Sequence, residues 1–370
     1  HTDPGRKTLA SELFRPGECR DNGLTAPIRS NILDIREAID ATVSGHSLSM
    51  ESAASVMRQI MSGEATPAQL GSYLTALRLK GETNEEIAGM AIVMREFSLR
   101  VNVDGMLVDS VGTGGDGLNT FNISTAAAFV AAGAGLKVAK HGNRAASGTC
   151  GSADVLEELG VKLDLSPEGV ERCIKESGIG FMFAQAFHPA MRHAGPVRRE
   201  IGIRTVFNIL GPLTNPARAQ SMLVGVAFPE LGQKMADVLC LLDTHHSIIV
   251  HGDGGLDEMT LSGDTVVWEV KQGKVSTWAL SVADTGLPVT PIEAVKGGDK
   301  AANAATMRAL LDGEGGPIRD YVLLNSAGVL LVGDLVSNIR DGVQLAAQTI
   351  DCGAAKDRME SMIAVSLLGS

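Results

Sequence analysis

The spacing of apolar residues divides the chain into two parts. From residue 31 to residue 100 the apolar positions recur at helical spacing, which predicts a module built of helices. Two capping boxes mark helix starts inside it, Thr66 with Gln69 and Thr83 with Glu86, because each polar side chain can bond the free backbone N–H groups of a first turn. The first part is therefore predicted to be all helical.

After residue 104, short β-branched runs alternate with alanine-rich helical segments, a pattern typical of a mostly parallel sheet covered by helices. The pattern predicts strands at 107–111, 136–139, 247–251 and 321–332 (the last with a helix start), a hairpin at 266–275, and helices at 125–135 and 299–311. We therefore expect an α/β protein with a small N-terminal helical domain and a larger α/β domain. The expected domains are 31–103, with a later helical contribution from about 188–212, and 104–370. Residues 1–30 are predicted to be a native extension or a cloning remnant.

Composition narrows the functional classes. Thirty-two basic against 43 acidic residues disfavour nucleic acid and anionic membranes as partners. The five cysteines are odd in number and never form a CxxC pair, so neither a disulfide framework nor a zinc site is indicated, and a reducing cytoplasm fits best. No apolar stretch is long enough to span a bilayer, so we expect a soluble protein.

The strongest local signal is a glycine-rich loop between a predicted strand and a predicted helix. The sequence VDSVGTGGDGLNTFNISTAAAF places glycines at 112, 114, 115 and 117, where backbone N–H groups can converge on an anion at the positive end of the following helix. The loop also satisfies GxGxxG, but a dinucleotide site needs an acidic residue about twenty positions later. The cationic segment KHGNR (140–144) stands there instead, which favours phosphates.

Two further segments carry candidate chemistry. Asp257 and Glu258 follow a predicted strand, and carboxylates beside a phosphate loop are typical magnesium ligands. A segment rich in proline and glycine holds four arginines, any of which can pair with a planar carboxylate through its rigid fork. The sequence does not choose among Arg192, Arg198, Arg199 and Arg204.

Taken together, these motifs resemble one family closely. The segments GTGGDGLNTFNIST, KHGNRA with GSADVLEELG, HPAMRHAGPVRREIGIRTVFNILGPLTNP and HGDGGLDEMT look like those of anthranilate phosphoribosyltransferases, and the similarity runs from about residue 47 into the C-terminal helices. The resemblance implies a homodimer whose active site lies at the hinge between two domains, in a fold shared with pyrimidine nucleoside phosphorylases. It implies Mg²⁺ as cofactor, and anthranilate and 5-phosphoribosyl 1-pyrophosphate as substrates in tryptophan biosynthesis.

The resemblance also implies a set of site residues. By motif position, those for phosphoribosyl pyrophosphate are Gly112, Gly115, Asp116, Thr120, Asn122, Ser124, Thr125, Lys140 and Ser152, with Gly142 and Arg144 in the same cationic segment. Ser124, Asp257 and Glu258 are implied for magnesium, and Lys140, Asp257 and Glu258 for catalysis. Gly112, Asn143 and Arg198 are implied for anthranilate, with Arg198 on its carboxylate and His141 nearby.

The chain departs from the family at Gly148 and Cys150, where relatives commonly carry serines that reach phosphate. Backbone N–H groups can replace such contacts. Two rival functions remain open from the sequence. One is a pyrimidine nucleoside phosphorylase, which would not need the acidic pair, and the other is a catalytically silent relative that binds nucleic acid, which the net charge of −11 disfavours.

Overall fold

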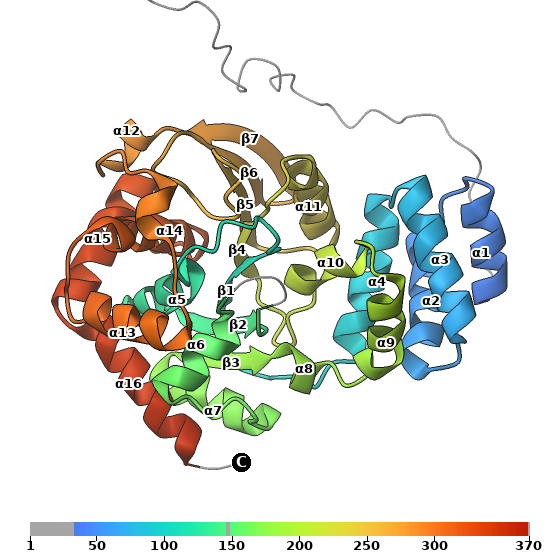
Figure 1. Ribbon diagram of the computed structural model, residues 1–370, viewed down its shortest axis with the longest axis horizontal. Helices are drawn as coiled ribbons and strands as arrows, with labels where there is room; N and C mark the ends of the chain where they lie inside the picture. Colours follow the sequence, from blue (N-terminus) through green and yellow to red (C-terminus); the bar gives the residue numbers. More distant parts are fainter. Residues whose placement is uncertain (1–32, 146–148, 369–370) are drawn as a thin grey trace, which may run out of the picture.

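The computed structural model describes residues 33–145 and 149–368, so the predictions for residues 1–30 and for Gly148 lie outside the described residues. The helical part lies beside the α/β part (Figure 1). It begins with α1 (Ile35–Val43), α2 (Met50–Ser62), α3 (Pro67–Lys80) and α4 (Asn84–Glu96). Both predicted capping boxes are confirmed, since Thr66 accepts from the N–H of Gln69 and Thr83 accepts from the N–H of Glu86.

A single seven-stranded sheet forms the centre of the larger part, in the order β3-β2-β1-β4-β5-β6-β7. The strands from β3 to β5 are parallel, and β6 and β7 form the predicted antiparallel hairpin. Their bounds are β1 (Leu107–Gly112), β2 (Lys137–Gly142), β3 (Ile179–Phe183), β4 (Ser221–Gly225), β5 (His246–Gly252), β6 (Thr265–Lys271) and β7 (Lys274–Leu280). The expected mostly parallel sheet is therefore confirmed.

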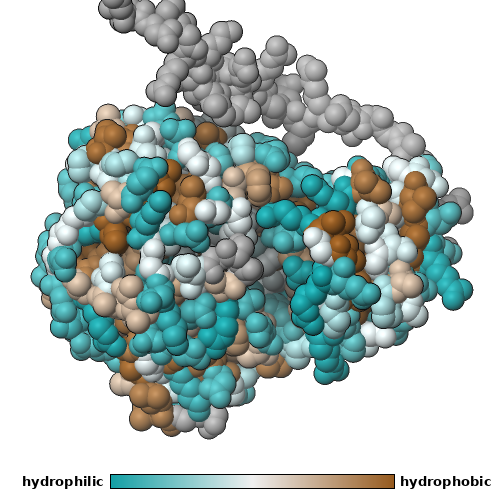
Figure 2. Space-filling model, in the orientation of Figure 1, coloured by the Kyte–Doolittle hydropathy of each residue, from teal (hydrophilic) through white to brown (hydrophobic). Residues whose placement is uncertain are grey.

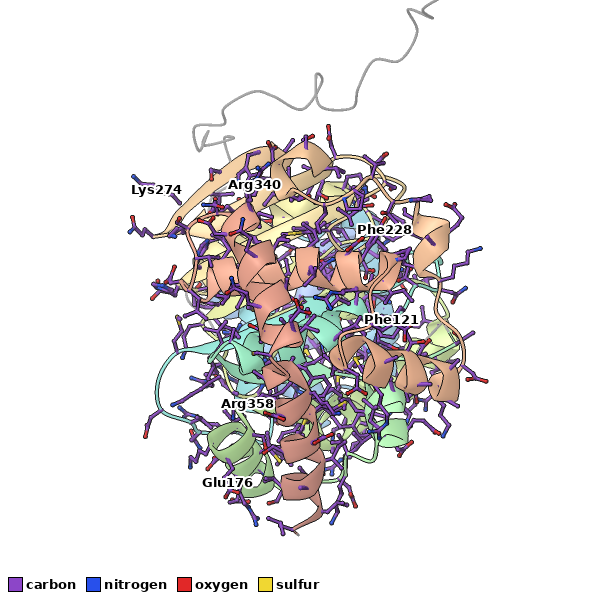
Figure 3. All side chains as sticks on the ribbon, turned by 90° about the vertical axis from the view of Figure 1, so that its left-hand side faces the viewer. Phe121, Glu176, Phe228, Lys274, Arg340 and Arg358 are labelled. Carbon is purple, nitrogen blue, oxygen red and sulfur yellow. The ribbon has the colours of Figure 1, made fainter. Side chains whose placement is uncertain are left out.

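Helices cover both faces of this sheet (Figure 1). The remaining helices are α5 (Ile123–Gly133), α6 (Ser152–Leu159), α7 (Pro167–Ser177), α8 (Ala184–Phe187), α9 (Met191–Ile201), α10 (Phe207–Leu210), α11 (Glu230–Leu241), α12 (Val282–Thr285), α13 (Lys300–Leu311), α14 (Pro317–Val332), α15 (Ile339–Asp351) and α16 (Ala354–Leu367), with short 3-10 turns at Gly211–Leu213 and Ile292–Val295. Helix α16, which carries Arg358, packs against α7, which carries Glu176 (Figure 3).

Side chains that alternate along a strand pack into different hydrophobic cores on opposite faces of the sheet. On β4, Leu223 joins the core under α5, α14 and α15, whereas Met222 and Val224 join the core that includes α1 to α4. Helices α9 and α10 share the second core through residues such as Val197 and Phe207. The helical part therefore shares this core with one face of the sheet, and α11 connects the two, since it contacts α4 as well as β5 and β6. Helices α9 and α10 join the helical part from later in the chain.

The predicted strand at 321–332 is wrong, because this segment lies within helix α14. Its residues from Tyr321 to Val332 are all buried, since α14 packs between the sheet, α5 and α15. A helix surrounded by other elements is apolar on every side, so its sequence lacks the polar stripe that identifies a surface helix.

Candidate active site

The candidate site lies where the strand order reverses direction. Strand β1 pairs with both β2 and β4, and ligands in open α/β sheets bind beyond the carboxyl ends of the strands at such a point. A cavity of about 600 Å³ opens there. Its lining comes from the loop after β1, the end of β2, the start of α6, the segment around α10 and the loop after β5.

Glycines at two strand ends bring the acidic loop over the sheet. A Cβ atom at Gly112 would lie 2.5 Å from Oδ2 of Asp257, and one at Gly225 would lie 1.6 Å from the carbonyl oxygen of Asp257. Gly112 and Gly225 face each other in the β1–β4 pair. Only residues without a side chain allow Asp257 to lie this close to both strands.

The glycine loop itself is shaped for an anion. Gly114, Gly115 and Gly117 have φ values of 66°, 85° and 72°, in the left-handed region that favours glycine. No side chain caps the start of α5, and the buried Thr125 hydroxyl beside it has no hydrogen-bond partner within the described chain. The backbone N–H groups of Ile123, Thr125 and Ala126 are already bonded to the carbonyls of Phe121 and Asn122, so the Thr125 hydroxyl is the free donor here. A free hydroxyl at the positive end of a helix can bind phosphate or carboxylate oxygens.

Lys140 is buried at the base of the cavity. Its Nζ donates to the carbonyl oxygen of Ser110 at 2.6 Å and lies 3.5 Å from Oγ of Ser124. Burial lowers the pKa of Lys140, while the nearby Asp109 and Glu258 oppose that shift. The ammonium is therefore held between the strand ends and the start of α5, where it can face an anionic ligand.

Asp257 and Glu258 are half-buried side by side. Burial raises the pKa of both carboxyl groups, and the charges of Asp116 and Asp257 respectively raise them further. Oδ2 of Asp257 accepts a hydrogen bond from the N–H of Gly114 at 2.8 Å, and Glu258 accepts one from the N–H of Ser124. The acidic pair thus touches both ends of the glycine loop, and a bound cation would relieve its repulsion.

These groups fit magnesium better than zinc. Within the described part of the chain, no cluster of three or more His, Cys, Asp or Glu side chains could hold a metal ion by itself. Magnesium is usually held by one or two carboxylates and completes its shell with water and substrate phosphates. Asp257 and Glu258 beside a phosphate-shaped loop, with the Ser124 hydroxyl near, supply such an incomplete oxygen set.

A pair of buried histidines lies at another side of the cavity, where His141 belongs to the lining and His188 contacts it from behind. Nε2 of His141 lies 3.2 Å from Nε2 of His188, and the backbone of Gly211 accepts from the His141 ring. Burial lowers the pKa of His141 to about 3 and that of His188 to about 4, so both rings are neutral near pH 7. The pair therefore adds no charge to this side of the cavity.

The structure assigns a different immediate role to Arg144. Its guanidinium donates to Asp154 and to both oxygens of Glu157 at the edge of the cavity. Ser152 lies nearby at the start of α6, where its hydroxyl donates to the carbonyl of Asn143. Arg144 therefore ties the loop after β2 to α6, and its charge is already balanced.

Fifteen of the sixteen predicted site residues line the one cavity, namely Gly112, Gly115, Asp116, Thr120, Asn122, Ser124, Thr125, Lys140, His141, Gly142, Asn143, Arg144, Ser152, Asp257 and Glu258. The exception is Arg198, whose guanidinium stacks on the Phe207 ring at 4.9 Å and does not belong to the lining. Sequence reasoning missed Arg204, Asn208 and Pro212 as lining residues. Only Arg204 carried a signal, as one of the four candidate arginines.

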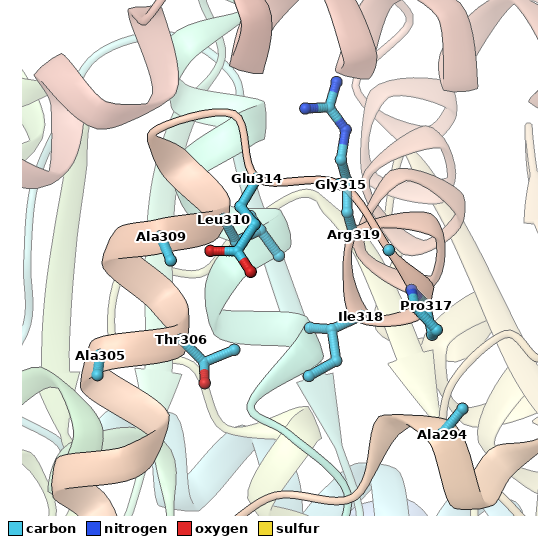
Figure 4. A pocket seen from close by; sticks show the side chains of 11 residues that line it. Ala294, Ala305, Thr306, Ala309, Leu310, Glu314, Gly315, Pro317, Ile318 and Arg319 are labelled. Atoms are coloured by element: carbon cyan, nitrogen blue, oxygen red, sulfur yellow. The ribbon is translucent and has the colours of Figure 1, made fainter.

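A second cavity, of about 430 Å³, lies between α13 and the start of α14 (Figure 4). Its walls are mostly small or aliphatic, including Ala305, Leu310 and Ile318. The guanidinium of Arg319 donates to the Gly313 carbonyl and to Asp351, and Figure 4 shows it pointing away from Thr306 and Ile318. No predicted site residue lies there, so this cavity is separate from the candidate site.

The fold and the site together define a two-domain glycosyltransferase. Residues 36–98 match the helical bundle domain of a glycosyl transferase family, and residues 104–356 match its a/b domain. The chain is 60% identical over 336 residues to the anthranilate phosphoribosyltransferase of Chloroflexus aurantiacus, covering 90% of this chain and 99% of that protein. The corresponding protein of Dehalococcoides mccartyi is 57% identical, with coverages of 90% and 98%. The chain belongs to the anthranilate phosphoribosyltransferase family.

Solved structures agree with this assignment. The Thermus thermophilus enzyme aligns with a TM-score of 0.85 at 45% identity and covers 89% of this chain and 99% of its own. The Saccharomyces cerevisiae enzyme, solved in complex with PRPP and Mg, aligns with a TM-score of 0.83 at 30% identity, with coverages of 90% and 98%. Within the described residues of this chain, no helix is long and apolar enough to cross a membrane.

Proposed function

We propose that this protein transfers the phosphoribosyl group of 5-phosphoribosyl 1-pyrophosphate to the amine of anthranilate. The products are N-(5-phosphoribosyl)anthranilate and pyrophosphate, and the step belongs to tryptophan biosynthesis. One observation carries the proposal: the glycine loop, Lys140 and the acidic pair Asp257 and Glu258 converge on one cavity. The family membership and the yeast relative solved with PRPP and Mg support the same reaction.

The roles of the site residues follow from this proposal. The loop glycines bind the phosphates through backbone N–H groups, and the start of α5 adds its positive end and the free Thr125 hydroxyl. Asn143 and Arg198 receive anthranilate, with Arg198 on its carboxylate. Arg198 stacks on Phe207, the neighbour of the lining residue Asn208, so a small shift of the segment around α9 would bring its guanidinium to the substrate.

Catalysis of this reaction acts mainly on the departure of the pyrophosphate leaving group. The nitrogen of anthranilate is an aniline amine, unprotonated near pH 7, so it attacks the anomeric carbon without a strong base. A carbon–nitrogen bond forms, the carbon–oxygen bond to pyrophosphate breaks with inversion, and the nitrogen then loses one proton. Lys140 offsets the charge that grows on pyrophosphate, and the cavity positions the two substrates.

Asp257, Glu258 and Ser124 would hold Mg²⁺. When bound, the ion supplies charge neutralisation to the departing diphosphate. Asp116, Asp257 and Glu258 line a cavity that receives an anionic ligand, so the carboxylates and the ligand repel each other. A cation that arrives with the substrate would offset this repulsion.

We also infer how the protein assembles and where in the cell it acts. Hydrophobic residues reach the surface of the helical part on the right of Figure 2, and Leu79 of α3 and Val43 of α1 are 83% and 70% exposed. Association would bury these exposed apolar side chains, so we infer a homodimer that forms through the helical part. The cysteine pattern supports a reducing cytoplasm.

A direct assay tests the reaction. We expect anthranilate fluorescence to decay when phosphoribosyl pyrophosphate and Mg²⁺ are both supplied, with one pyrophosphate released per anthranilate consumed. The comparison arm supplies a pyrimidine nucleoside and inorganic phosphate instead. Turnover in the comparison arm, with none of anthranilate, would replace the proposal by the nucleoside phosphorylase function.

A further inference from the structure

Arg204 lies between the two parts of the molecule. It follows α9, whose Ala194 and Val197 are buried in the core of the helical part, after a left-handed turn at Gly202 with φ of 70°. The guanidinium nevertheless reaches the glycine loop of the α/β part, where a Cβ atom at Gly115 would lie 2.7 Å from Nη1. One side chain therefore links a segment anchored on the helical part to the phosphate loop.

The guanidinium is held in place by an aromatic ring. Cζ of Arg204 lies 4.9 Å from the centroid of Phe228, which follows β4 and lies on the same side of the molecule as Phe121 in Figure 3. Stacking of this kind fixes the plane of the fork while leaving its N–H donors available.

Arg204 also has no anionic partner of its own. Among residues 33–145 and 149–368, no ion pair or side-chain hydrogen bond joins Arg204 to another group, and the side chain is exposed to the cavity. Arg144, the other arginine of the lining, is satisfied by Asp154 and Glu157. The cavity thus contains one arginine whose charge is still available to a ligand.

Building on the proposed reaction, we propose that Arg204 is a further substrate-binding residue that takes the diphosphate of phosphoribosyl pyrophosphate beside Gly115 of the glycine loop. The position beside Gly115 selects the diphosphate, because the loop carrying Gly115 also contacts Asp257 through Gly114. A guanidinium binds two phosphate oxygens through parallel hydrogen bonds, which an ammonium cannot copy. Glycine at 115 leaves room for that fork beside the backbone.

Substitution of Arg204 tests the assignment by steady-state kinetics and calorimetry. We expect Arg204→Ala to raise the KM for phosphoribosyl pyrophosphate, and to weaken the binding of magnesium pyrophosphate, by about tenfold to a hundredfold, the usual cost of losing a charged hydrogen-bonding partner. Arg204→Lys should recover part of the loss. Phe228→Leu should also raise the KM for phosphoribosyl pyrophosphate and weaken the binding of magnesium pyrophosphate, but by less than Arg204→Ala. Arg198→Ala should show the reverse split, raising the KM for anthranilate more.

The matched control is Arg358→Ala, which removes the same charge from α16, on the outside of the α/β part (Figure 3). Circular dichroism of each variant verifies folding, and Arg204→Lys with Phe228→Leu carries the test if the alanine variant does not fold. An unchanged affinity for magnesium pyrophosphate in Arg204→Ala, or equal losses for both substrates, overturns the assignment. Wild-type protein that fails to consume anthranilate would instead defeat the proposed function.

Discussion

At the residue scale, the site owes its geometry to positions where a side chain is missing or buried. Gly112 and Gly225 permit the close approach of Asp257, while Lys140 is placed by the Ser110 carbonyl. The glycine turn, Lys140 and the acidic pair were recognisable in the sequence because each has a characteristic pattern. The contact of Arg204 with Gly115 was not, since it joins residues 89 positions apart through tertiary packing alone.

The buried His141–His188 pair makes stability depend on pH. The pKa of His188 is lowered from 6.5 to about 4, so the unfolded chain binds a proton below pH 6.5 that the folded protein rejects. Folding stability is therefore lost as pH falls from 6.5 towards 4, by roughly 2 kcal/mol at about pH 5 for this one group. Burial raises the pKa of Asp109 to about 6, so this group makes the folded protein more stable as pH falls. The effect of His188 alone must therefore be measured by comparing a variant with the wild type.

We expect His188→Gln to lose less stability than the wild type between about pH 7 and pH 5, because glutamine does not titrate. The difference in loss should be roughly 2 kcal/mol, measured by urea unfolding at the two pH values. Equal losses in the two proteins would mean that His188 is already charged in the folded state.

At the element scale, periodicity located most strands and helices, and it failed where an element is buried on every side. The hairpin of β6 and β7 and the helix α13, capped by Asp299, lie where the pattern placed them. The segment that became α14 has the same apolar run that a buried strand would show. The predicted run 321–332 is itself longer than an ordinary strand, and that length was a clue in the sequence.

The crossing of α2 and α4 gives a prediction at this scale. A Cβ atom at Gly89 of α4 would lie 2.2 Å from the Met50 carbonyl oxygen, a clash with backbone that cannot turn aside. Gly89→Ala should lower the free energy of unfolding by about 1–3 kcal/mol. Gly71→Ala in α3 is the matched control, because the nearest atoms to its Cβ lie 3.9 Å away.

The control should gain about 0.5–1 kcal/mol from the better helix propensity of alanine. Urea unfolding of both variants measures the difference. The same stability change in both would show that α2 and α4 do not pack closely at Gly89.

At the scale of the whole molecule, the helical part and the α/β part meet beside the cavity. Helix α9 is packed in the core of the helical part, and the segment that follows it contributes Arg204, Asn208 and Pro212 to the cavity lining. A relative shift of the two parts therefore changes the site directly, and closure would exclude water from the reacting carbon. The sequence indicated the two parts, and the resemblance implied a site at their hinge, but it did not mark Asn208 and Pro212, which lie in the resembling segment 188–216, as lining residues.

The site as a whole depends on a glycine turn, a buried lysine and two metal-binding acids acting together on one diphosphate. The most direct measurement is a calorimetric titration of phosphoribosyl pyrophosphate, with and without Mg²⁺, into the wild type and into the double variant Asp257→Asn, Glu258→Gln. Mg²⁺ should strengthen binding to the wild type by about tenfold or more and have little effect on binding to the variant, which lacks the charged ligands. An equal effect of Mg²⁺ on both proteins would contradict the account.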